Sequence, residues 1–159
     1  MSPEIFISYS REDFDKVKPI IDALEINGIY PSQFFFDKQN IFGATNIAKE
    51  ISQAILDCKV LIFFISKNAV NSLWVNREVY FALDRNKHVL PLQLEPADLP
   101  SQLQLLLAGI NHLNLYSQDE KYVVRDILKS LDNIGVKIDK DTHHFLIYII
   151  YQRMILINF

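Results

Sequence analysis

A tryptophan and a glutamate one helical turn apart are the residues of this chain best suited to chemistry. Ser72 is a good N-cap for a helix expected to run from Leu73 to about Asn86, and it follows a strongly apolar run. Trp74 and Glu78 are four residues apart, so they share one face of that helix. A carboxylate there could stabilise a developing positive charge, and the indole could stack on a flat ring. The same spacing also fits an ordinary amphipathic helix with a surface glutamate.

Other catalytic chemistries find little support in the sequence. The four glycines form neither GxGxxG nor a phosphate-binding loop, and no GxSxG motif marks a serine hydrolase. The four histidines lack the spacing of metal ligands, so no metal site is expected. Cys58 directly precedes an apolar run and is expected to be a buried, inert thiol. Asp37 is either a ligand group or a turn residue that opens a loop.

Composition points to a single globular domain in a reducing compartment. A length of 159 residues suits one domain with a sizeable core. The net charge is −3 and no block of Lys or Arg occurs, which argues against nucleic-acid binding. A single cysteine excludes an internal disulfide framework, and the N-terminus does not resemble a signal peptide. The expected location is therefore cytoplasmic.

Apolar patterns predict an α/β fold in which strands and helices alternate. Strands are expected at residues 5–7, 29–36, 60–65, 88–92 and 110–115. Helices are expected at residues 12–27, 47–57, 73–86, 99–108 and 119–133. The run Val60–Ile65 is apolar on both faces, as central parallel strands are. Pro31 cannot donate to a ladder, so the second strand belongs at an edge. We therefore predict a flavodoxin-like five-stranded parallel sheet of order 2-1-3-4-5 with helices on both faces.

This topology also predicts where a ligand would bind. In a doubly wound sheet, ligands bind beyond the carboxyl ends of the strands where the strand order reverses, here between the first and third strands. The loops 8–11 and 66–71 meet at that point, and the polar loop 37–46 borders them. Trp74 and Glu78 approach the same place because their helix starts there. The topology thus supports the functional interpretation of Glu78 independently of its pairing with Trp74.

The C-terminal region differs in character from the rest. We place the end of the domain at residue 134 and expect residues 135–159 to form a linker followed by an apolar extension. The apolar part, Phe145–Phe159, has fifteen residues, fewer than the roughly 20 needed to span a bilayer. It could pack on the domain as an added helix or strand, contact another subunit, or attach to a membrane surface. The first two are favoured over membrane attachment.

Three motifs, in order along the chain, resemble those of the Toll/interleukin-1 receptor and resistance-protein (TIR) domain family. The first is Ile5-Phe6-Ile7-Ser8-Tyr9-Ser10 with Asp13. The second is Asp37 with Gly43, and the third is Ser66 with Ser72, Trp74 and Glu78. Each motif alone is weak, but together they cover roughly residues 3 to 133. The resemblance implies the flavodoxin-like fold predicted above.

The resemblance implies one of two functions. Many TIR domains cleave NAD+ between nicotinamide and ribose, giving ADP-ribose or a cyclic isomer, and their catalytic glutamate falls on Glu78. The same resemblance gives Trp74 a place in the pocket, with Ser72 beside it and Tyr9, Ser10, Arg11 and Asp37 on the loops around it. Phe42 and Gly43 fall on the loop Asp37–Asn46, through which family members associate with themselves or with other TIR domains. NAD+ would be a substrate, so no cofactor is implied. The alternative is an adaptor that binds other TIR domains without catalysis.

Overall fold

A five-stranded parallel sheet forms the centre of the protein. The computed structural model describes residues 2–36 and 44–140. All pairings are parallel, and the strand order is β2-β1-β3-β4-β5. The strands are β1 (Ile5–Ser8), β2 (Phe34–Phe36), β3 (Val60–Ile65), β4 (His88–Gln93) and β5 (Leu113–Asn114). The predicted fold class and strand order are confirmed.

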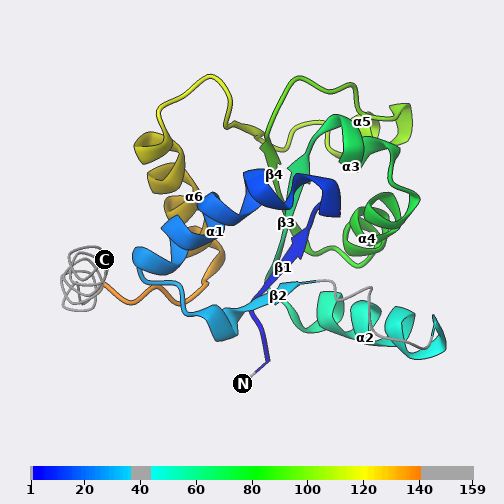
Figure 1. Cartoon of the computed structure of the whole chain (residues 1–159). Coiled ribbons are helices and arrows are strands. Elements are labelled where there is room, and N and C mark those ends of the chain that lie inside the picture. The colour runs from blue at the N-terminus through cyan, green and yellow to red at the C-terminus, as the bar shows by residue number, and fades with distance from the viewer. Residues whose placement is uncertain (1, 37–43, 141–159) are drawn as a thin grey trace, which may run out of the picture.

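Helices cover both faces of this sheet (Figure 1). Two of them, α1 (Phe14–Ile26) and α6 (Glu120–Ile134), lie together on one face. The opposite face is covered by α2 (Ala44–Asp57) and α4 (Leu73–Asp84). Two short helices, α3 (Lys67–Asn71) and α5 (Ser101–Leu106), follow the carboxyl ends of β3 and β4. The molecule therefore has three layers, with the sheet between two helical layers.

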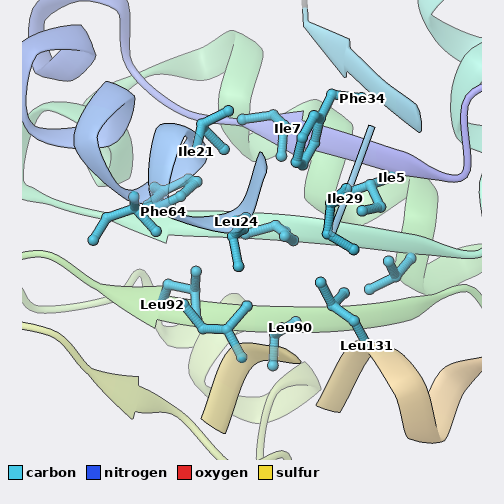
Figure 2. Close-up of a cluster of buried hydrophobic side chains, with 14 of the residues drawn as sticks. Ile5, Ile7, Ile21, Leu24, Ile29, Phe34, Phe64, Leu90, Leu92 and Leu131 are labelled. Carbon is cyan, nitrogen blue, oxygen red and sulfur yellow. The ribbon is translucent and has the colours of Figure 1, made fainter. Parts of the chain in front are cut away.

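The alternation of side chains along β3 divides the core into two halves. Ile62 and Phe64 point into the cluster beneath α1 and α6, which Figure 2 shows with Phe64 close to Ile21 and Leu24. Leu61, Phe63 and Ile65 point into the cluster beneath α2 and α4. Every residue of β3 is buried, so both faces of this strand are apolar. Burial on both faces explains why Val60–Ile65 forms the central strand, as predicted.

Several elements differ in length from their predicted bounds. The second strand is only three residues long, because a 3₁₀ helix (Pro31–Gln33) takes up the beginning of the predicted run. The fifth strand pairs over only two residues. Residues 44–46, predicted as the end of a loop, already belong to α2. The polar break after β3, also predicted as a loop, forms α3, whose start is capped by Ser66.

The packed chain continues past the boundary that we placed at residue 134. Val136 is 2% exposed and belongs to the core, so the segment after α6 does not begin as a free linker. The amide of Lys137 donates to the Glu4 carboxylate, and the amide of Asp139 donates to the Gly28 carbonyl. Partial burial opposes ionisation of Glu4, but hydrogen bonds from Lys59, the Lys137 amide and Gln33 prevail and lower its pKa.

The apolar extension 145–159 lies outside the described residues, so its three interpretations stay predictions. Within the described part of the chain, no helix combines the length and apolar character needed to cross a bilayer.

Gly28 provides a test of this C-terminal packing. Its φ is +103°, and a Cβ atom at this position would lie 2.1 Å from the Asp139 carbonyl oxygen. We expect Gly28→Ala to lower the free energy of unfolding by about 2 kcal/mol, because it adds steric overlap to a strained backbone. Gly109 has a φ of +86° and open space around it, so Gly109→Ala is a control for the strain alone. Equal losses for the two variants in urea denaturation would mean that residue 139 does not pack on Gly28.

Candidate active site at the carboxyl ends of β1 and β3

The Glu78 carboxylate lies at the switch point of the sheet and is held by Ser8. The Ser8 hydroxyl donates a hydrogen bond to Oε2 of Glu78, with 2.6 Å between the oxygens. Glu78 is 4% exposed and Ser8 is 0% exposed, so the interpretation of Glu78 as an ordinary surface glutamate is wrong. A buried carboxylate requires hydrogen bonds or charges that stabilise its ionised form. Glu78 is therefore a specifically oriented group at the place where the topology predicts a ligand.

The start of α4 places Trp74 beside this carboxylate. The Ser72 hydroxyl accepts a hydrogen bond from the Val75 amide at 3.3 Å, so the predicted N-cap is confirmed. Trp74 is half-buried and packs against the cluster beneath α2 and α4. Its indole N–H is buried, and no acceptor for it occurs among the described residues. Because Ser72 caps the helix, it fixes the start of α4 and with it the position of Trp74.

A second buried carboxylate, Asp13, ends the short 3₁₀ helix that follows β1. It is 2% exposed and accepts hydrogen bonds from the Ser66 hydroxyl and from Nδ2 of Asn68, the latter at 2.9 Å. The Ser66 oxygen in turn accepts from the Ala69 amide at 2.9 Å. Asp13 thus joins the segment after β1 to the start of α3. From the sequence, Asp13 and Ser66 are recognised only as members of two separate motifs. The place of Ser66 directly after the apolar run of β3 is the one sequence feature that points to a buried polar partner at this edge.

Glu95 is a third acidic residue at this edge, and no motif or spacing in the sequence indicates its contacts. It accepts from the Lys67 amide at 2.9 Å and from the Lys16 ammonium at 3.3 Å. The hydrogen bond from the Lys67 amide is the main reason that its pKa lies below the ordinary value, with Lys16 contributing. Glu95 connects the loop after β4 to the first turn of α3 and to α1. Its role in this structure is to position those elements.

The structure does not bring all of the predicted loop residues beside β1 to the side of the sheet that carries Glu78. Tyr9 is half-buried, and its ring centroid lies 6.4 Å from those of Phe14 and Phe36. Arg11 is exposed and opens a 3₁₀ helix (Arg11–Asp13), while the Ser10 carbonyl accepts from the Asp13 amide. Ser10 and Arg11 therefore lie on the loop at the edge of the site, whereas Tyr9 packs on the cluster beneath α1 and α6, on the other side of the sheet from Glu78.

Three predicted site residues, Asp37, Phe42 and Gly43, lie outside the described residues, so their roles stay predictions. Across residues 2–36 and 44–140, no group of three His, Cys, Asp or Glu side chains could hold a metal ion. Cys58 is buried, and this burial raises the pKa of its thiol to about 11. A thiol of this kind is protonated at neutral pH and is a poor nucleophile.

A groove of about 580 Å³ opens on the other side of the sheet, between α1 and α6. Its lining includes Asn27, Asp119, Lys121 and Arg125. These side chains have mixed charge and belong to the helices of the opposite face from α4. The groove is thus separate from the Glu78 site, and it lacks a convergent set of groups that would define a chemistry.

Comparisons with known proteins identify the family of this chain. The family model described as "TIR domain" matches residues 5–142, which is most of the chain. The chain therefore belongs to the TIR domain family. No curated protein is similar enough in sequence to count as a match.

Solved structures of low sequence identity share the fold. The TIR domain of the Toll-related receptor TRR-2 from Hydra magnipapillata has a TM-score of 0.66 and 17% identity, over 82% of this chain and 99% of that chain. The RPS4 and RRS1 TIR domain heterodimer has a TM-score of 0.55 and 16% identity, over 84% of this chain and 98% of that chain. The CMP N-glycosidase BcmB from Clostridium botulinum has a TM-score of 0.51 and 18% identity, over 77% of this chain and 96% of that chain.

Proposed function

We propose that this TIR domain cleaves NAD+ between nicotinamide and ribose, with Glu78 as the catalytic residue. The observation that carries the proposal is the oriented Glu78 carboxylate, bound by Ser8 at the switch point and one helical turn from Trp74. BcmB, whose chain has a similar fold, is described as an N-glycosidase, which is the same class of bond cleavage. That likeness concerns the fold, so the choice of NAD+ as substrate rests on the family and on the site residues.

The reaction needs few protein groups. The bond between the nicotinamide nitrogen and the ribose carbon breaks, and its electron pair neutralises the cationic pyridinium ring, so the leaving group needs no proton. Positive charge grows on the ribose, as it does in glycoside hydrolysis, and a fixed carboxylate stabilises that charge. Water then adds to the ribose carbon and releases a proton, giving ADP-ribose. Attack by another group of the same nucleotide instead would give a cyclic isomer. Trp74 would stack on a flat ring of the substrate.

Access to Glu78 suggests that the proposed activity depends on assembly. Only 4% of its surface is exposed in the single chain, whereas the ribose must reach the carboxylate for the reaction to occur. We therefore propose that association of TIR domains, through the loop Asp37–Asn46, opens or completes the site. The RPS4 and RRS1 TIR domains form a heterodimer, which illustrates association within this fold. The cytoplasmic location inferred from the cysteine content stays a prediction.

The assay is incubation of the purified protein with NAD+ over a wide range of protein concentration. We expect nicotinamide release per molecule to rise with protein concentration, because the fraction of assembled protein rises. Phe42→Ala or Gly43→Pro should move that rise to higher concentration, and forced clustering should restore part of the activity. Chromatography of the products distinguishes ADP-ribose from a cyclic isomer.

Two outcomes would count against this proposal. The same specific activity at every protein concentration would mean that the enzyme works as a single chain, which would refute the dependence on assembly. Binding to other TIR domains without NAD+ turnover at any concentration would establish the alternative function, a non-catalytic adaptor.

A further inference from the structure

Ser8 has a fixed position at the end of the first strand, on the side of the sheet that faces α4. It pairs in register with Phe63 of β3, so the backbone that carries its hydroxyl belongs to the centre of the sheet. Phe6, two residues earlier, points into the cluster beneath α2 and α4, and strand alternation places Ser8 on the same side. The first polar side chain on this side of β1 is thus the one that binds Glu78.

The hydrogen bond from Ser8 restricts a side chain that would otherwise rotate. A glutamate has three rotatable side-chain bonds, and the helix that carries Glu78 fixes only the first part of this chain. The Ser8 hydroxyl binds Oε2 at 2.6 Å across 70 residues of sequence, so one carboxylate oxygen is tied to the sheet. A hydroxyl that donates to the ionised form also favours the charge that the proposed reaction needs.

Structural stability alone does not explain why this pair is present. A buried ionised group is costly, and an apolar pair of similar volume is often equally stable or more stable. Every residue of β1 is fully buried, and the neighbouring side chains of the cluster are apolar. A serine and a glutamate in this setting are therefore better explained by a requirement for an oriented carboxylate.

We propose that Ser8 is a positioning residue that orients the Glu78 carboxylate for catalysis. This inference rests on the proposed function for its kinetic consequences, while its structural consequence can be measured separately. Ser8 acts through Glu78 and contributes mainly when charge develops on the ribose. Its loss should therefore lower kcat more than it changes KM.

The kinetic test combines Ser8→Ala with Glu78→Gln in a double-mutant cycle. We expect Ser8→Ala to lower kcat by about 10- to 100-fold, the scale of one hydrogen bond to a charged group, with KM changed less than about twofold. The double variant should be no slower than Glu78→Gln alone, because Ser8 affects catalysis only through the negative charge that Glu78→Gln removes. If the two losses multiply, or if Ser8→Ala raises KM alone, the inference is overturned.

Ser66→Ala is the matched control. It also removes a buried hydroxyl that donates to a carboxylate at a strand end, but its partner is Asp13. Any loss of activity it causes should multiply with that of Glu78→Gln, because the two residues share no hydrogen-bond partner. If Ser8→Ala does not give folded protein, Ser8→Cys retains a weaker donor and replaces it in the same cycle.

A measurement without substrate separates this inference from the proposed function. In protein with ¹³C-labelled glutamate, the carboxyl signal of Glu78 can be assigned by its absence in Glu78→Gln. We expect Ser8→Ala to shift this signal at neutral pH, and Ser66→Ala to leave it in place. An unmoved signal in Ser8→Ala would overturn the inference even in an active enzyme. A shifted signal in a protein that does not consume NAD+ would refute the proposed function and still support the role of Ser8 in holding Glu78.

Discussion

Glu78→Gln should lower NAD+ consumption by about 100-fold or more, the scale reported for losing one preorganised electrostatic group. Glutamine keeps the size of the side chain, and its carbonyl oxygen can still accept the Ser8 hydroxyl. It lacks the negative charge that stabilises the developing charge on the ribose. The variant should remain folded, because removing a buried charge also removes its desolvation cost. Nicotinamide release and a thermal unfolding curve measure the two effects side by side.

The control for this variant is Glu50→Gln on the exposed surface of α2. It makes the same chemical change at an exposed position and should leave NAD+ turnover unchanged. A folded Glu78→Gln protein that consumes NAD+ at the parent rate would exclude Glu78 as the catalytic residue. A loss of activity that appears only with a loss of folded protein would also remove the support for a catalytic role.

The sequence allowed prediction of those features that depend on local pattern. The run Val60–Ile65 is apolar on both sides, and only a central strand covered by helices on both faces can bury all of it. Ser72 begins α4 because a serine hydroxyl readily accepts from the amides of a first helical turn. The topology then placed Glu78 near the switch point. These inferences needed only spacing and the order of elements.

Contacts between segments that are far apart in the sequence could not be predicted in this way. The Glu78 carboxylate is held by Ser8, whose position follows from the register of β1 against β3. A helical face pattern cannot distinguish a surface glutamate from one that meets a serine 70 residues away. The segment after α6 was interpreted as a linker because it is polar. Its backbone and Val136 pack on the domain instead, which composition does not reveal.

The predicted lengths of the two edge strands were wrong for a related reason. The pattern of residues 110–115 alternates as a strand would, yet the strand itself pairs only Leu113 with Leu92 and Asn114 with Gln93. The Leu115 amide adds one hydrogen bond to the Gln93 carbonyl beyond the strand. The second strand does lie at the edge of the sheet, as predicted. Pro31 is not part of it, however, because the proline begins a 3₁₀ helix and β2 starts only at Phe34. Strand bounds depend on which neighbour is available for pairing, and that is a property of the whole sheet.

The site has two serine–carboxylate pairs, and they are expected to serve different purposes. Glu78 belongs to the face that carries Trp74, whereas Asp13 connects the segment after β1 to α3. Both oxygens of Asp13 accept hydrogen bonds from side chains that hold the start of α3. Its contribution should therefore appear mainly in stability, which allows the two pairs to be distinguished by mutation.

Asp13→Ala should lower the free energy of unfolding by about 3 kcal/mol, the scale for breaking a buried hydrogen-bonded charge network. The substitution leaves the Ser66 hydroxyl and the Asn68 amide without their acceptor at a site that is 2% exposed. Asp13→Asn should lower the free energy of unfolding by less than Asp13→Ala. The oxygen of the new amide can still accept from Asn68, and its nitrogen can donate to the Ser66 oxygen.

The exposed Asp15, two residues along the chain, provides the control for Asp13. Asp15→Ala removes the same group from the first turn of α1 without a buried partner, and surface substitutions of this kind usually change stability by less than about 0.5 kcal/mol. Urea denaturation of the three variants should rank their stabilities as Asp15→Ala, Asp13→Asn and Asp13→Ala, from most to least stable. If Asp13→Ala were as stable as Asp15→Ala, the hydrogen bonds to Ser66 and Asn68 would contribute nothing to folding. The connection between β1 and α3 would then depend on apolar packing alone.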